Sequence, residues 1–212
     1  MEILKEVYDR VIEGNIAETE NLVKEALGRK VDAQKIMNGS FVRALDVVGE
    51  KFSAGEYFLP EMLTAAMAVK SGMEILKPLL SQSDAKLRGT VVAGTVAGDI
   101  HDIGKNMVCM MLEAAGFKVV DLGVDVPGEK FLQAVRDNQA DIIAMSALLS
   151  TTMISIAKTI HLVHSAGLEP KVKIMVGGAP VTQDFAQAIG ADGYASDAAL
   201  AVKKAKELLG FK

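Results

Sequence analysis

Residues 98–106 read Gly98-Asp99-Ile100-His101-Asp102-Ile103-Gly104-Lys105-Asn106, and the second half of the chain is organised around them. An apolar run, Val91 to Ala97, precedes this stretch, and a second apolar run, Met107 to Leu112, follows it. A short apolar run, a polar stretch bounded by glycines and a longer apolar run predict a strand, a loop and a helix. In open α/β folds such a loop lies at the carboxyl edge of the sheet, where ligands bind.

His101 stands in the middle of this loop, where its imidazole faces a ligand. Asp99, two residues earlier, is placed to accept a hydrogen bond from one ring nitrogen and to leave the other nitrogen for a metal. Gly104 lets the backbone approach a bulky ligand. The pattern therefore predicts a metal-ligating histidine. On this motif alone, the alternative that His101 only caps a helix stays open.

Two other kinds of site fit the sequence poorly. A phosphate-binding loop needs four residues between its glycines and a Ser or Thr after its lysine, whereas five residues separate Gly98 from Gly104 and Asn106 follows Lys105. A zinc site needs three or four ligands. The chain has one cysteine, Cys109, and its other histidines lie in a later helical stretch.

The loop motif is followed by two further motifs in order. Asp99-x-His101-x-x-Gly104, then Ser146-x-Leu148, then Gly177-Gly178 resemble the three-part signature of cobalamin-binding domains in methyltransferases. The earlier stretch Gly55 to Met62 resembles the helical cap that those proteins place over the corrin. The resemblance covers nearly the whole chain. It is to the corrinoid carrier proteins of methanol, methylamine and betaine methyl transfer and to the cobalamin-binding part of methionine synthase.

This resemblance implies cobalamin, as methylcobalamin and cob(I)alamin or a related corrinoid, with His101 bound to cobalt in place of the cofactor's own base. The displaced nucleotide tail is expected in a slot of the sheet, and an apolar lid is expected over the corrin. The implied contacts are Gly98, Asp99, Ile100, His101, Asp102, Ile103 and Gly104 in the loop; Ser146, Leu148, Ser150, Thr151, Thr152, Gly177, Gly178, Ala179, Tyr194 and Ala195 around the tail; and Phe52, Leu59 and Met62 in the lid.

The resemblance also implies a relay that links proton uptake to the cobalt state, formed by His101, Asp99 and a hydroxyl. Thr152 falls at the position of that hydroxyl. Serine is the more familiar residue there in methionine synthase, so Thr151 and Ser150 stay open as substitutes. Each turnover is expected to release and rebind His101.

The chain changes its pattern near residue 84. Helical spacing fills the first part, with helices expected over 3–12, 17–27, 33–52 and 59–80, which predicts a four-helix bundle cap in residues 1–84. Ser81 to Lys86 is the expected linker. Strands expected over 91–95, 118–121, 142–146, 173–176 and 193–195 alternate with helices. We therefore predict a doubly wound, Rossmann-like, flavodoxin-type sheet of five parallel strands in residues 85–212.

Composition limits the partners and the location. The chain has 212 residues, half of them apolar, and 27 acidic against 23 basic residues give a net charge of −4. This charge argues against nucleic acid as a partner. The charged start, Met1 to Glu6, is unlike a signal peptide, and no uninterrupted apolar segment reaches about 18 residues. A single cysteine fits a reducing compartment. We expect a cytoplasmic protein without a membrane partner.

The predicted function is that of a methyl carrier. A substrate-activating (β/α)₈ barrel alone needs about 250 residues, so the chain is expected to act as the carrying subunit and not to catalyse alone. Its expected partners are a substrate:corrinoid methyltransferase, a corrinoid:acceptor methyltransferase and a reductive activator. Methylated or quaternary amines are the preferred donors. Three alternatives stay open: the adenosylcobalamin-binding subunit of a radical mutase, a cobalamin-dependent regulator, and a corrin-free receiver-like domain.

Overall fold

The computed structural model describes residues 2–79, 88–168 and 171–211. Contacts between Cα atoms divide the chain into two compact units, Met1–Lys86 and Leu87–Lys212. The predicted linker, Ser81 to Lys86, and the predicted boundary at residue 84 lie outside the described residues. The two units are therefore described separately.

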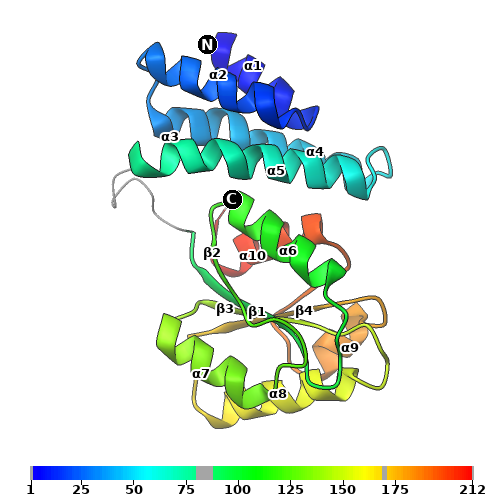
Figure 1. Ribbon diagram of the computed structural model, residues 1–212. Helices are drawn as coiled ribbons and strands as arrows, with labels where there is room; N and C mark the ends of the chain where they lie inside the picture. Colours follow the sequence, from blue (N-terminus) through cyan, green and yellow to red (C-terminus); the bar gives the residue numbers. More distant parts are fainter. Residues whose placement is uncertain (1, 80–87, 169–170, 212) are drawn as a thin grey trace. The chain divides into compact units, whose positions relative to one another are not determined.

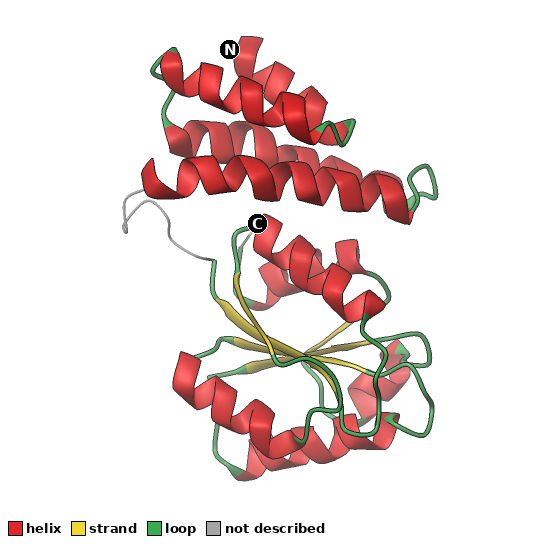
Figure 2. Ribbon diagram, in the orientation of Figure 1, coloured by secondary structure: helices red, strands yellow, loops and turns green. Residues whose placement is uncertain are grey.

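The first unit is helical throughout its described part, as its periodicity predicts (Figures 1 and 2). Its elements are α1 (Glu2–Ile12), α2 (Ile16–Gly28), α3 (Ala33–Ile36), η1 (Met37–Val42), α4 (Arg43–Ser53), α5 (Leu59–Leu76) and η2 (Lys77–Leu79). Pro60 lies in the first turn of α5, where its missing N–H leaves no hydrogen bond unmade. The unit buries the apolar residues that recur at helical spacing, for example Ile3, Val7 and Val11 on α1.

One expectation for this unit is wrong in detail. A regular α-helix was expected over residues 33–52, but Met37–Val42 form a π-helical segment between α3 and α4. A π turn takes in more residues than an α turn, and so it changes which side chains face the core. Here Ser40 donates from Oγ to the Leu4 carbonyl oxygen at 2.8 Å, and the Phe41 ring is fully buried. Tertiary contacts of this kind are not visible in the spacing of apolar residues.

The second unit is the predicted α/β fold. Its elements are β1 (Thr90–Thr95), α6 (Ile103–Ala114), β2 (Lys118–Asp121), α7 (Gly128–Asn138), β3 (Ile142–Ser146), α8 (Met153–Ser165), β4 (Lys173–Gly177), α9 (Gln183–Ala188), β5 (Gly193–Ala195) and α10 (Ala198–Leu208). The five strands pair in parallel in the order β2-β1-β3-β4-β5. This is the doubly wound, flavodoxin-type order, so the predicted fold class is confirmed.

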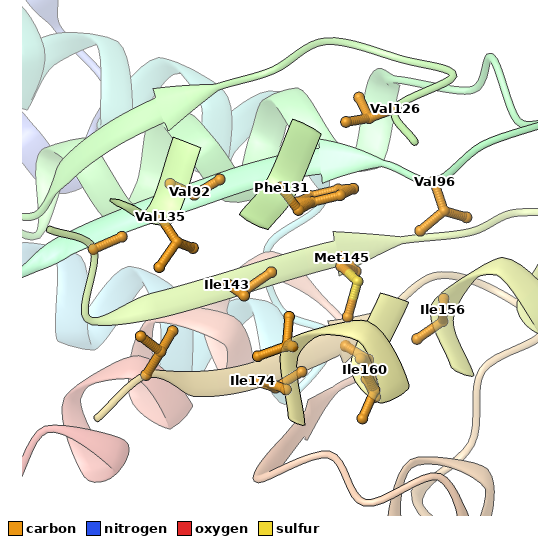
Figure 3. Close-up of a cluster of buried hydrophobic side chains, with 14 of the residues drawn as sticks. Val92, Val96, Val126, Phe131, Val135, Ile143, Met145, Ile156, Ile160 and Ile174 are labelled. Carbon is orange, nitrogen blue, oxygen red and sulfur yellow. The ribbon is translucent and has the colours of Figure 1, made fainter. Parts of the chain in front are cut away.

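Helices cover both faces of this sheet (Figure 1). On one face, α7, α8 and α9 pack on the strands through a cluster that includes Phe131, Ile143, Ile156 and Ile174 (Figure 3). On the other face, α6 and α10 pack against each other and against the strands. β1 lies inside the sheet, and all but its first residue are buried. The loop that follows β1 therefore begins from a fixed point.

Gly72 of α5 provides a test of the helical unit, because a Cβ there would overlap the Phe41 ring. We expect Gly72→Ala to lower the free energy of unfolding by about 1–3 kcal/mol through overpacking. That loss should outweigh the gain in helix propensity of about 0.5–1 kcal/mol. Urea unfolding followed by circular dichroism measures the difference.

Gly28→Ala is the matched control, because Gly28 ends α2 and a Cβ there would meet nothing within 4 Å. This variant should unfold at or above the wild-type urea midpoint. If Gly72→Ala behaved like Gly28→Ala, the Phe41 ring would not be packed tightly against α5.

Candidate functional site

The candidate site lies where two loops leave neighbouring strands. β1 pairs with β2 on one side and with β3 on the other, so the chain order reverses at β1. In doubly wound sheets the loops at such a point diverge and leave a crevice at the carboxyl ends of the strands. The β1–α6 loop carries Asp99 and His101, and the β3–α8 loop carries Leu148, Leu149 and Thr152.

The Asp99 carboxylate joins these two loops. Its Oδ2 accepts hydrogen bonds from Thr152 Oγ1 at 2.7 Å and from the Leu148 and Leu149 amides at 2.8 and 3.3 Å. Its Oδ1 accepts from the His101 amide at 3.1 Å and contacts His101 Nδ1 at 2.8 Å. The Asp99 side chain is 0 % exposed. A buried carboxylate with this many donors is held in one orientation.

The same contacts keep Asp99 ionised. Burial alone would raise the pKa of this carboxyl, because it disfavours the charged form. The hydrogen bonds from Thr152, Leu148 and His101 together outweigh burial and hold the Asp99 pKa well below its usual value of 3.8. Asp99 is therefore a fixed negative charge beside the imidazole at neutral pH.

This charge sets the orientation and tautomer of His101. A contact from Nδ1 to an ionised carboxylate places the ring proton on Nδ1, so the lone pair is on Nε2. The His101 side chain is 47 % exposed, in contrast to Asp99. Its backbone is held as well, because Thr95 Oγ1 donates to the His101 carbonyl oxygen at 2.9 Å. The predicted contact of one ring nitrogen with Asp99 is present in the structure, and ligation of a metal by the other nitrogen remains a prediction. The helix-capping alternative does not describe this ring.

The two segments that meet at Asp99 also expose apolar side chains. Ile100 and Ile103 are 74 % and 75 % exposed, and Leu148 and Leu149 are each 42 % exposed. A Cβ on Gly104 would meet nothing within 4 Å, so the backbone there is open to a ligand. Exposed apolar groups on the same loops as an exposed imidazole suit a broad, largely apolar molecule that binds a metal at its centre. The residues present therefore fit a corrinoid.

Thr152 supplies the hydroxyl on Asp99. Ser150 and Thr151, the two open substitutes, are exposed, while Thr152 is 6 % exposed. Thr152 Oγ1 also lies 2.8 Å from the Leu149 carbonyl oxygen, so the hydroxyl has two acceptors within reach. This arrangement matches the expected order of His101, Asp99 and a hydroxyl.

The glycines after β4 have a structural explanation. A Cβ on Gly178, at φ +116°, would overlap the Ala147 carbonyl oxygen, and a Cβ on Gly177 would lie 2.7 Å from the Ala195 carbonyl oxygen. Backbone contacts alone therefore require both glycines. Their expected place in a nucleotide slot remains a prediction, as it does for Ser146, Ala179, Tyr194 and Ala195, of which Ala179 is exposed and the others are half-buried or buried.

The three expected lid residues lie in the helical unit. Phe52, in the last turn of α4, is half-buried. Leu59 begins α5 and is 44 % exposed, whereas Met62, in the next turn, is 1 % exposed. Their expected contact with a corrin remains a prediction.

Two further observations concern metal-ligating side chains in the described part of the chain. There, no group of three or more His, Cys, Asp or Glu side chains could hold a metal ion. Burial raises the pKa of the Cys109 thiol to about 12, so it is neither a thiolate ligand nor a nucleophile at neutral pH.

Sequence reasoning missed two polar contacts that support the loop. The Asp125 side chain accepts from the Gly98 amide at 2.7 Å, and the buried Lys105 ammonium contacts Asp121 at 2.5 Å. Asp125 has φ +51°, a conformation that costs a residue other than glycine roughly 1–3 kcal/mol. A lysine in an otherwise apolar helix face is a signal that could have indicated Lys105, but nothing in the local pattern of Asp125 predicts its contact.

Comparisons with known proteins cover both units. A family model described as B12 binding domain matches residues 89–203, and a second model with the same description matches residues 3–77. Trimethylamine corrinoid protein 1 of Methanosarcina acetivorans is 42 % identical over 210 residues, covering 98 % of this chain and 97 % of that protein. The dimethylamine corrinoid protein of Methanosarcina barkeri is 43 % identical and covers 98 % of each chain.

Two solved structures share the fold. A cobalamin-binding protein of Desulfitobacterium hafniense has a TM-score of 0.84 at 31 % identity, covering 97 % of this chain and 98 % of that one. A chain from the methanol:cobalamin methyltransferase complex of Methanosarcina barkeri has a TM-score of 0.85 at 30 % identity, covering 100 % of this chain and 81 % of that one.

The Asp99 pKa shift gives a pH-dependent prediction. Because the folded-state pKa is lowered, ionised Asp99 stabilises the fold above its unfolded value of 3.8, and this contribution is lost as the pH falls below that value. Asp99→Asn should lower the free energy of unfolding by about 2–3 kcal/mol at pH 7. The difference from wild type should shrink between about pH 5 and pH 2.

Urea unfolding at several pH values, on protein without corrinoid, measures this difference. Asp184→Asn is the control: it removes an exposed carboxylate in the first turn of α9 and should change stability by less than about 0.5 kcal/mol. A difference between wild type and Asp99→Asn that stayed constant down to pH 2 would contradict the role given to the Asp99 charge.

The Thr152 hydroxyl can be tested with two substitutions of different chemistry. Thr152→Val keeps the shape but leaves the buried carboxylate one donor short, so we expect a loss of about 1–2 kcal/mol. Thr152→Ser keeps the donor, so most of the stability should remain. A larger loss in Thr152→Ser than in Thr152→Val would show that the methyl group of Thr152, and not its hydroxyl, is what the site requires.

Proposed function

The chain belongs to the family of B12-binding corrinoid proteins, and we propose that it carries a methyl group from a methylated amine to an acceptor methyltransferase. In this proposal the corrinoid binds with its nucleotide base displaced and with His101 as the lower ligand of cobalt. The chain binds and orients the cofactor, and its partners carry out the transfer in either direction.

One observation carries the proposal: the contact of 2.8 Å between His101 Nδ1 and the buried Asp99 carboxylate. It directs the Nε2 lone pair away from the carboxylate and fixes the orientation of the ring as a ligand. When bound, the corrinoid supplies a cobalt centre that accepts a methyl group and gives it up again. The protein's part is to hold the imidazole in place and to keep a fixed charge behind it.

The remaining residues have supporting parts. Exposed Ile100, Ile103 and Leu148 would contact the lower face of the corrin and exclude water around the cobalt. The β3–α8 loop and the end of β4, with Ser146, Gly177 and Gly178, would line the slot for the displaced tail. Phe52, Leu59 and Met62 would form the lid over the upper face and would have to move when a partner reaches the methyl group.

The donor is proposed from the relatives. Proteins named trimethylamine and dimethylamine corrinoid proteins match this chain at 42 % and 43 % identity over nearly its full length. Similarity to a chain of a methanol:cobalamin methyltransferase complex supports a methyltransferase as partner. We therefore propose a methylated amine as donor, with two methyltransferases and a reductive activator as partners in the cytoplasm. None of the helices that the structure describes is both long and apolar enough to span a membrane.

The function can be tested by methyl transfer. The full chain, reconstituted with hydroxocobalamin and reduced, is mixed with candidate amine, methanol or betaine methyltransferases and the corresponding donor. We expect methylation of the cobalt, seen in its absorption spectrum, with trimethylamine or dimethylamine and not with methanol. Methylation from methanol alone would overturn the proposed donor. A protein that retained adenosylcobalamin and accepted no methyl group would favour the mutase alternative.

The ligation can be tested without any partner. In the reconstituted wild type, we expect the spectrum of a corrinoid whose base is displaced and replaced by histidine, and in His101→Gly we expect that histidine-ligated spectrum to be lost. Asp99→Asn should retain the ligand but raise the cobalt midpoint potential, because the oxidised metal loses the stabilising negative charge behind its ligand. Identical spectra for wild type and His101→Gly would contradict the ligand assignment.

A further inference from the structure

We propose that Asp125, from the β2–α7 loop, is a positioning residue that holds the Gly98–Asp99 turn and through it sets the direction of the His101 ring. The consequence for cobalt ligation rests on the proposed function. The consequence for the hydrogen bond between His101 and Asp99 does not, because it concerns only this chain.

The segment that Asp125 contacts is a tight turn. The Asp99 amide donates to the Val96 carbonyl oxygen at 3.1 Å, which closes a turn over residues 96–99. Gly98, the third residue of this turn, has φ +84°, as a type II turn requires. The turn ends on Asp99, so any change in the turn moves the carboxylate that His101 contacts.

Asp125 holds this turn from two directions. Its Oδ1 accepts from the Gly98 amide at 2.7 Å, and its own amide donates to the Asp99 carbonyl oxygen at 2.9 Å. Asp125 therefore accepts a hydrogen bond from the Gly98 amide and donates one to the Asp99 carbonyl oxygen, so it holds the Gly98–Asp99 segment at both ends. A hydrogen bond to an ionised acceptor is also stronger than one between neutral groups.

The backbone of Asp125 supports this interpretation. Three residues other than glycine have positive φ within the described parts of the chain: Lys30, Asp125 and Gln139. Gln139 is the left-handed cap of α7 and Lys30 follows the end of α2, and this conformation commonly ends a helix. Asp125 lies at no helix end. A strained residue held by compensating contacts is a feature that marks functional loops.

The loop that carries Asp125 is itself fixed. Gly123 accepts at its carbonyl oxygen from the Thr95 amide, and Val126 donates its amide to the Thr95 carbonyl oxygen, both at 3.0 Å. At the start of the loop, Asp121 pairs with Lys105 of α6. These contacts join the loop to the last residue of β1 and to α6, on either side of His101. Asp125 therefore reaches Gly98 from a rigid support.

Three variants separate the contributions of Asp125. Asp125→Gly removes the carboxylate and relieves the positive φ, so it should fold as wild type does. Asp125→Asn keeps an oxygen acceptor for the Gly98 amide and tolerates positive φ. Glu129→Gln is the matched control, because it removes an exposed carboxylate from the first turn of α7, near Asp125, without touching the turn.

The first measurement uses the full chain without corrinoid. Hydrogen exchange of the Gly98 amide and of the His101 Nδ1 proton is followed by NMR. In Asp125→Gly we expect both protons to exchange roughly tenfold faster or more, the factor that follows from losing one hydrogen bond to a charged acceptor. Asp125→Asn should exchange at rates between those of Asp125→Gly and wild type, because it keeps a weaker, neutral acceptor, and Glu129→Gln should exchange as wild type does. Unchanged exchange in Asp125→Gly would overturn the proposal, whatever cobalt does.

The second measurement uses protein reconstituted with hydroxocobalamin. The ratio of histidine-ligated to unligated cobalt, read from the absorption spectrum, should fall roughly tenfold in Asp125→Gly and recover in Asp125→Asn. Faster exchange with an unchanged ligation ratio would show that Asp125 is structural only. If wild-type cobalt were not histidine-ligated at all, the ligation proposal would fail, and the exchange data alone would decide whether Asp125 orients His101.

Discussion

The site depends on one buried negative charge. A carboxylate without exposure to water is unfavourable unless it is fully hydrogen-bonded, and Asp99 meets that condition with donors from the β3–α8 loop and from His101 in its own loop. The donors of the β3–α8 loop lose their partner if the two loops separate. The β1–α6 and β3–α8 loops are therefore held together by the same carboxylate that orients the imidazole, and the geometry of the ligand cannot relax independently of the fold.

The sheet topology explains why these donors can meet. β1 and β3 are neighbours in space although α6, β2 and α7 lie between them in the sequence. Their parallel register pairs Thr95 with Ser146, the last residue of each strand, so both loops begin at the same level of the sheet. Asp99, four residues beyond Thr95, and Thr152, six residues beyond Ser146, can then reach each other. The exposed imidazole of His101 is thus held at Nδ1 by the buried, hydrogen-bonded Asp99 carboxylate, while the rest of the ring stays accessible to a ligand.

The sequence predicted much of this arrangement because the relevant signals are local. The five strands were expected within about one residue of their observed bounds, since buried parallel strands are continuous apolar runs between turn residues. The contact between Asp99 and His101 follows from their spacing of two residues. What the sequence did not show depends on residues that are distant in the chain. The π segment forms where Phe41 and Ser40 pack on other helices, and Gly178 is required because a side chain there would meet the Ala147 backbone. Asp125 lies 27 residues from Gly98, whose amide donates to it.

Thr152 stands where the resemblance to methionine synthase implies a serine, and it still supplies a hydroxyl to Asp99. Its one hydroxyl proton has two acceptors, the ionised Asp99 carboxylate at 2.7 Å and the neutral Leu149 carbonyl oxygen at 2.8 Å. The charged acceptor forms the stronger hydrogen bond, so the proton is directed to Asp99. The Thr152 methyl group lies on the side of Gly98, where a Cβ added to that glycine would be 3.6 Å from it. A serine would supply the proton but leave that side open. Thr152 therefore donates a hydrogen bond to the Asp99 carboxylate and also packs beside the turn that carries Asp99. Asp125 supports the same turn from the β2–α7 loop.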